Sequence, residues 1–235
     1  MSDSFGAPPP FPPPLPAPAR GIPWDDRDRL GFPGALVETI KRVLFEPTAF
    51  FRAMPVAGGL GGPLGFGLIV GYLGLAVQAM YDAVFESVAG RMFGDFTRRA
   101  EFQRYLELLE GGGRLVATLV LGPVFLVVLL FVGAGITHLF LMLLGGARRG
   151  FEATFRVACF IQAAAVFSVL PFCGAPIHAV YQVVLFVIGL AEAHQIGKWT
   201  AAGAVLLPGL VICCCCAGIL GAAFGGIASL ARFAR

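Results

Sequence analysis

Hydrophobic residues gather into four long stretches that contain no Asp, Glu, Lys or Arg. They comprise residues 53–81, 115–147, 157–191 and 199–231, and are 29, 33, 35 and 33 residues long. The hydrocarbon core of a bilayer is about 30 Å thick, and about 20 apolar residues of helix are enough to cross it. Each stretch is therefore long enough to span a membrane.

The third stretch is too long for a single span. As one helix, its 35 residues would reach roughly 50 Å at about 1.5 Å per residue. Its centre, residues 171–176, reads Pro-Phe-Cys-Gly-Ala-Pro, and prolines around a glycine favour a tight turn over a continuous helix. One long kinked helix is the alternative. The pattern predicts an all-α fold, an integral membrane bundle within residues 56–235. Its five transmembrane helices are expected at about 58–82, 115–146, 152–170, 177–195 and 201–231.

Composition agrees with a membrane protein. The chain is 57% hydrophobic and 13% charged, and a soluble domain of this size could not bury so much apolar surface. The long connection at residues 82–114 carries five basic and six acidic residues. Because neither this loop nor the overall charge of +3 makes a strongly basic surface, no nucleic-acid partner is expected.

Two segments precede the first span. Residues 1–22 are rich in proline, which favours an extended, disordered tail. Residues 23–55 contain an amphipathic helix, and such a helix just before a span is typical of one lying in the membrane interface. A partner-binding helix is the alternative. The side chains predicted to bind the interface are Trp24, Phe50, Phe51 and Arg52.

Charge in the short loops predicts the orientation. Arg148 and Arg149 lie between the second and third helices, whereas residues 171–176 contain no basic residue. Cytoplasmic loops carry an excess of Lys and Arg. We therefore expect a multi-pass protein of the cell (inner) membrane with its N-terminus in the cytoplasm.

Several polar residues fall within or at the ends of the spans and form a candidate intramembrane cluster. Ionisable groups at this depth are costly and often functional. If the third and fourth helices are antiparallel about Gly174, Arg156 and Glu192 lie at equal depth, and an ion pair between them is expected. Extension of the arginine alone to the headgroups is the alternative. The candidates are Arg156, Glu192, His194, His138, Gln162 and Gln182.

No pattern in the sequence predicts catalysis or a metal. The cysteines Cys213–Cys216 are consecutive, so on a helix their side chains point about 100° apart and cannot converge on one ion. The sequence contains no metal-site, hydrolase or phosphate-loop motif, so neither a cofactor nor an enzymatic activity is expected. Glycines Gly221 and Gly225 are spaced for close helix packing and predict a homo-oligomer through the fifth helix.

Three motifs resemble those of a known family. Residues 47–55 read Pro-Thr-Ala-Phe-Phe-Arg-Ala-Met-Pro, and residues 151–157 read Phe-Glu-Ala-Thr-Phe-Arg-Val. Residues 190–194, Leu-Ala-Glu-Ala-His, are followed at 204–208 by Ala-Val-Leu-Leu-Pro. In this order, over residues 22–225, they resemble the bacterial branch of the Yip domain (Ypt/Rab-interacting protein) family. The resemblance implies an all-helical integral membrane protein with a cytoplasmic N-terminus.

The resemblance does not name an activity. Eukaryotic members bind Rab-type GTPases, but the Asp-Leu-Tyr-Gly-Pro motif typical of them is absent from the N-terminal region, and the arginine-rich composition suggests a bacterial source. A Rab-type partner is therefore not expected, and the protein partner is unknown. We expect a non-enzymatic, membrane-organising or scaffold protein acting through its bundle and N-terminal region. The alternative is a transporter, channel or lipid-moving protein with a polar intramembrane site.

Overall fold

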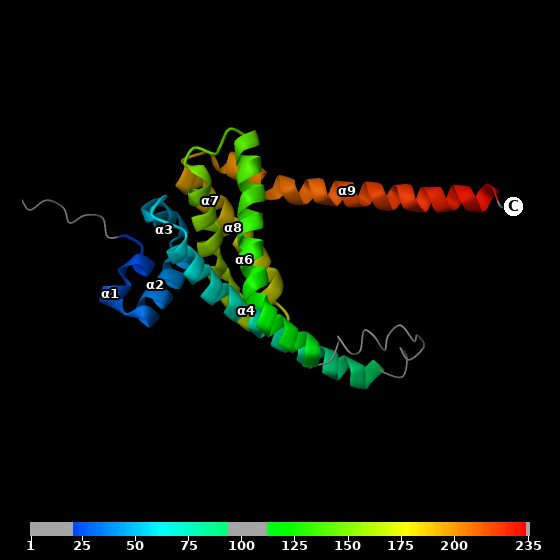
Figure 1. Cartoon of the computed structure of the whole chain (residues 1–235), viewed down its shortest axis with the longest axis horizontal. Helices are drawn as coiled ribbons and strands as arrows, with labels where there is room; N and C mark the ends of the chain where they lie inside the picture. Colours follow the sequence, from blue (N-terminus) through cyan, green and yellow to red (C-terminus); the bar gives the residue numbers. More distant parts are fainter. Residues whose placement is uncertain (1–20, 94–111, 234–235) are drawn as a thin grey trace, which may run out of the picture.

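The computed structural model describes residues 21–93 and 112–233, and the side chains of residues 21–85 and 115–217. The predicted proline-rich tail falls almost entirely outside these residues. Within the described residues every regular element is a helix, and five spans are long and apolar enough to cross a membrane, which confirms the predicted fold class. The spans are α4 (Gly61–Phe93), α6 (Gly112–Leu143), α7 (Gly150–Phe160) with η2 (Ile161–Val169), α8 (Gly174–His194) and α9 (Lys198–Phe233) (Figure 1).

The predicted division of the third stretch is confirmed. A turn at residues 170–173 separates η2 from α8. Gly174 is required there because a Cβ atom at this position would lie 2.3 Å from the carbonyl oxygen of Phe167. The sequence pattern did not predict that the second half of this span, η2, is a nine-residue 3₁₀ helix, a length that is uncommon for this tighter helix.

The third span, α7 with η2, is the centre of the bundle. In its most apolar 18-residue segment 72% of the residues are buried, whereas in the corresponding segments of the other spans 11% to 28% are. Glycines on α4 let this neighbour approach closely: a Cβ at Gly67 would lie 3.1 Å from the backbone of Cys159, and one at Gly74 would lie 2.6 Å from Ala165. Small residues are the usual means of tight helix packing in lipid.

A tyrosine compensates for a proline inside α6. Pro123 has no N–H group, so the carbonyl of Leu119, four residues earlier, loses its helical donor. The hydroxyl of Tyr72 on α4 donates to this carbonyl oxygen at 2.8 Å. The hydrogen bond between the two helices thus satisfies a backbone group that water cannot reach in a bilayer.

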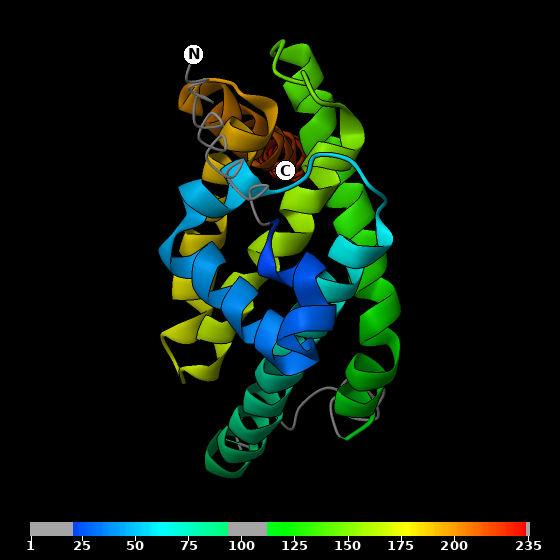
Figure 2. The same cartoon turned by 90° about the vertical axis from the view of Figure 1, so that its left-hand side faces the viewer.

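Residues 22–54 fold back onto one flank of the bundle, and we call them the N-terminal cover. The cover contains η1 (Pro23–Asp26), α1 (Arg27–Leu30), α2 (Phe32–Phe45) and α3 (Pro47–Ala53). Figure 2, which faces this flank, shows the cover in front of the bundle.

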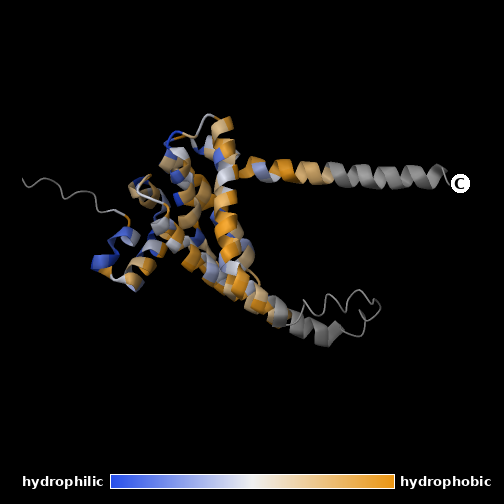
Figure 3. Cartoon of the chain, in the orientation of Figure 1, coloured by the Kyte–Doolittle hydropathy of each residue, from blue (hydrophilic) through white to orange (hydrophobic). Residues whose placement is uncertain are grey.

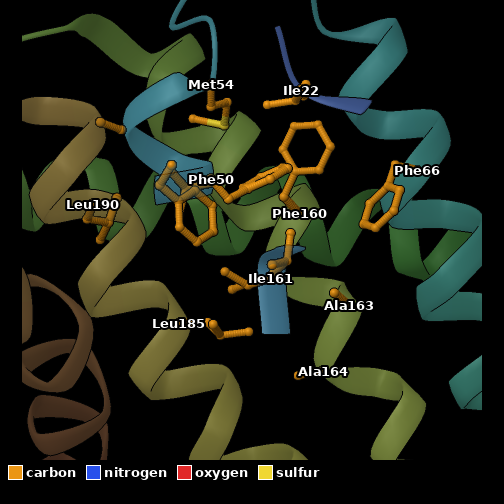
Figure 4. Close-up of a cluster of buried hydrophobic side chains, with 14 of the residues drawn as sticks. Ile22, Phe50, Met54, Phe66, Phe160, Ile161, Ala163, Ala164, Leu185 and Leu190 are labelled. Carbon is orange, nitrogen blue, oxygen red and sulfur yellow. The ribbon is translucent and has the colours of Figure 1, made fainter. Parts of the chain in front are cut away.

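The aromatic residues of the cover lie in the protein core and do not face the membrane interface, contrary to prediction. Trp24, Phe50 and Phe51 are only 1–3% exposed. The rings of Trp24 and Phe66 are in contact, with centroids 5.3 Å apart. Contacts at 5.2 and 5.3 Å continue from Phe66 to Phe160 and from Phe160 to Phe50 (Figure 4). The apolar face of the amphipathic segment therefore packs against the third span. Of the four predicted interface residues, only Arg52 is exposed.

The cover extends along about half of α8. Near one end, Arg52 of α3 pairs with Glu192, and further along the hydroxyl of Tyr181 donates to the carbonyl oxygen of Leu44 at the end of α2. Residues 181 and 192 are 11 positions apart, which corresponds to about 16 Å of helix. The remaining flanks of the bundle, above all α6, present large apolar side chains (Figure 3).

Candidate functional site

Five of the six predicted polar residues divide into three separate groups, and the sixth, Glu192, pairs with Arg52 of the cover. Two of these groups lie near the end of the bundle where α7 begins and α8 ends, which also carries Arg148, Arg149 and Lys198. We call it the basic end. The third group lies deeper, between α6, the third span and α8.

The first group contains two predicted histidines, linked by a threonine that the sequence pattern did not single out. The Oγ1 of Thr154, on α7, lies 2.9 Å from Nδ1 of His138 on α6 and 2.9 Å from Nε2 of His194 on α8. Thr154 and His194 are fully buried. Three spans therefore meet in one hydrogen-bonded chain.

The donor and acceptor of each of these hydrogen bonds follow from a further bond made by the backbone of Arg149. The N–H of Arg149 donates to Nδ1 of His194 at 3.2 Å, so this nitrogen is an acceptor. A neutral imidazole carries its single proton on the other nitrogen, and Nε2 of His194 therefore donates to the Thr154 hydroxyl. That hydroxyl then has one proton to donate, which goes to Nδ1 of His138. Every polar atom in contact is satisfied with both rings neutral, as a buried site requires.

The second group holds the connection between the cover and the bundle. Arg156 is 3% exposed, and its guanidinium pairs with Glu152, one turn earlier on α7, at 3.1 Å. The same arginine donates to the carbonyl oxygen of Gly59 at 2.8 Å, while the Gly59 N–H donates to Glu152 at 2.7 Å. Gly59 has a φ of +95°, a conformation that glycine adopts without strain.

The predicted pair between Arg156 and Glu192 is wrong. Both oxygens of Glu192 instead accept hydrogen bonds from the guanidinium of Arg52 at 3.1 Å. This hydrogen bonding raises the pKa of the exposed Arg52. Equal depth on two antiparallel helices does not make two side chains face each other, because direction changes by about 100° per residue. Each of the two ionic residues has a nearer partner.

The two glutamines form the third group. Gln162 and Gln182 line a groove of about 200 Å³ between α6, the third span and α8, and its other walls are apolar. In the described residues neither amide has a hydrogen-bonding partner. The six predicted candidates therefore do not form a single polar site.

In the described part of the chain, no three His, Cys, Asp or Glu side chains come close enough together to bind a metal ion. Cys213–Cys216 are exposed along α9. The predicted contact between copies at Gly221 and Gly225 lies outside the described side chains.

Sequence reasoning missed Thr154 and Glu152. The i, i+4 spacing of Glu152 and Arg156 was a usable signal, since such pairs meet on a helix surface. Thr154 offered none, because nothing in a local pattern shows which hydroxyl lies between two histidines on other helices.

These observations define the class of protein: a multi-pass helical membrane protein in which most of the ionisable candidates have partners within the protein, such as Arg156 with Glu152 and His194 with Thr154. A family model, the Yip1 domain, matches residues 41–220, and the chain belongs to this family. Members of the family are generally not enzymes. No match was found among curated proteins or among solved structures.

Proposed function

We propose that this protein is a non-enzymatic membrane scaffold of the inner membrane, with its N-terminus in the cytoplasm and a protein partner bound to the N-terminal cover. The observation that carries this proposal is the outer face of the cover. There α2 exposes Lys41 and Arg42 beside Phe45 and Val37, which are 80% and 51% exposed.

The depth of this face supports a protein partner over lipid. The cover reaches about half-way along α8, so its charged residues lie beside a membrane-spanning helix. Charged side chains in contact with hydrocarbon are costly. Exposed aromatic and aliphatic side chains next to arginine are typical of protein interfaces. A bound partner would cover Phe45 and Val37 and could pair with Lys41, whereas Arg42 is already paired with Glu38 at 3.0 Å.

The paired polar groups inside the bundle support a structural role for them. Arg156 and His194 are each bonded within the protein, one to the loop that leads out of the cover and the other to a threonine on α7. The transporter or lipid-moving alternative needs these groups to face a passage. Within the described residues, the feature that favours this alternative is the glutamine-lined groove.

A photo-crosslinking residue at position 45 of the full-length protein, in its native membrane, tests the proposal. We expect a discrete protein adduct that is reduced by the double change Lys41→Glu and Arg42→Glu. The matched control position is Phe172, which is 94% exposed in the turn at the opposite end. Adducts to lipid alone from position 45, or equal protein adducts from both positions, would contradict the scaffold function.

A further inference from the structure

The fifth span begins inside the bundle and then leaves it. Ala201 and Ala204 are fully buried, and a Cβ at Gly203 would lie 3.1 Å from Leu144 at the end of α6. From Leu206 onward the side chains are mostly exposed. Figure 1 shows α9 running across the direction of α6 and away from the other spans.

This direction conflicts with the composition of α9. Helices that point in such different directions cannot both cross the same flat bilayer along its normal. A helix lying in the headgroup layer needs one polar face, whereas residues 199–231 contain no charged residue. The described part of α9 is apolar enough to be a span, so in a bilayer it must turn toward the direction of α6 and α8.

The bundle has a groove between α6 and α8 that is apolar apart from Gln162 and Gln182. Its walls come from α6 and α8, its floor is the third span, and its volume is about 200 Å³. The first turns of α9 already contact the ends of the same two helices. The groove thus continues the existing interface of α9 toward the opposite end of the bundle.

A link suited to such a turn precedes α9. Gln195, directly after α8, has a φ of +56°, and Gly197 directly precedes α9. Only residues 195–197 join the two helices, so a change of backbone angles in this link alters the direction of α9 relative to α8.

We propose that this groove is the docking position of α9 of the same chain. By helical periodicity the face that continues Ala201 and Ala204 contains Pro208 and Val211. Val211 then comes level with Val183 on α8, because the two helices are antiparallel about the link at residues 195–197 and these two positions are about equally far from it. Docking covers the exposed apolar side chains of the groove and of α9 together.

Disulfide cross-linking of the full-length chain in lipid nanodiscs tests this docking. In a variant whose six native cysteines are replaced by alanine, the pair Val183→Cys and Val211→Cys should form an intrachain disulfide on oxidation. The matched control is Val183→Cys with Gly209→Cys, at similar depth but about 200° away around α9. Peptide mass spectrometry identifies the linked positions, and a non-reducing gel separates intrachain from interchain products.

A second variant blocks the groove without disturbing the bundle. Gly133 lines the groove, and a Cβ at this position meets nothing within 4 Å. Gly133→Phe should therefore abolish the disulfide between positions 183 and 211. Gly135→Phe, on the same helix and equally unobstructed but outside the groove, should leave it intact.

Three results would overturn the proposal. An interchain disulfide would mean that α9 of a second copy occupies the groove. Equal yields from positions 209 and 211, or no disulfide from either, would mean that α9 does not dock through the inferred face. A disulfide unaffected by Gly133→Phe would place the contact outside the groove.

Discussion

At the scale of single residues, the interior of this protein depends on polar groups that satisfy one another. Thr154 shows this most clearly, since one hydroxyl serves a histidine on α6 and another on α8. Its neighbour Arg156 has the same role for the loop that follows the N-terminal cover, where it bonds both Glu152 and the backbone of Gly59.

Replacing Thr154 with valine should destabilise the protein by about 1–3 kcal/mol, because it leaves two ring nitrogens without their partner. Thr154→Ser keeps the hydroxyl and should lose clearly less stability. Unfolding of the purified protein in mixed detergent measures both free energies. Equal losses for valine and serine would mean that methyl packing, and not the hydrogen-bonded chain, is what Thr154 contributes.

Double-mutant cycles should distinguish the observed ion pair between Arg156 and Glu152 from the pair that the sequence predicted between Arg156 and Glu192. Arg156→Ala should cost on the order of 2 kcal/mol, since it removes hydrogen bonds to a charged group. It should couple to Glu152→Ala, with a combined loss smaller than the sum. With Glu192→Ala its effect should add within about 0.5 kcal/mol; strong coupling there would contradict the geometry of Arg52 and Glu192.

At the scale of helices, α4 packs closely against the third span through its glycines, and it also donates a hydrogen bond to a backbone carbonyl of α6 that lacks its helical donor. The second half of the third span is a 3₁₀ helix from Ile161 to Val169 that contains three successive alanines, and α4 approaches this span through Gly67 and Gly74. On the other side of α4, Tyr72 donates to the carbonyl oxygen that Pro123 leaves free in α6.

The role of Tyr72 can be tested by restoring the backbone N–H that Pro123 lacks. Tyr72→Phe should destabilise the protein by about 1 kcal/mol, the usual net value of one hydrogen bond. In a Pro123→Ala background the new N–H can bond the Leu119 carbonyl, and the same tyrosine change should then cost little. Detergent unfolding of the four proteins gives both costs. An unchanged cost in the Pro123→Ala background would assign the effect of Tyr72 to ring packing.

At the scale of the whole molecule, the flanks and ends of the bundle differ in character. One flank carries the N-terminal cover with its charged outer face, and the others are apolar. The basic end carries Arg148, Arg149 and Lys198, while the opposite end has the uncharged turn that contains Cys173. Positive residues favour the cytoplasmic side.

This asymmetry predicts the result of thiol labelling in intact cells. Cys173 is exposed, and in a variant that keeps it as the only cysteine it should react with a membrane-impermeant reagent added outside. Gly145→Cys, in an otherwise cysteine-free chain, should react only after permeabilisation, because the loop near Arg148 is then cytoplasmic. The reverse pattern would place the N-terminus outside.

The sequence by itself determined the all-helical fold, the five spans and the turn near Gly174. These features follow from local properties: a helix without charges crosses a bilayer, and prolines around a glycine interrupt it. Only the tertiary structure decided what the amphipathic cover packs against. An apolar face suits a bilayer interface and a protein core equally well, and in this structure Phe50 and Phe51 are buried in the core. It also decided the partners of Arg156 and Glu192, because depth follows from position along a helix, whereas direction and neighbours depend on how several helices pack together.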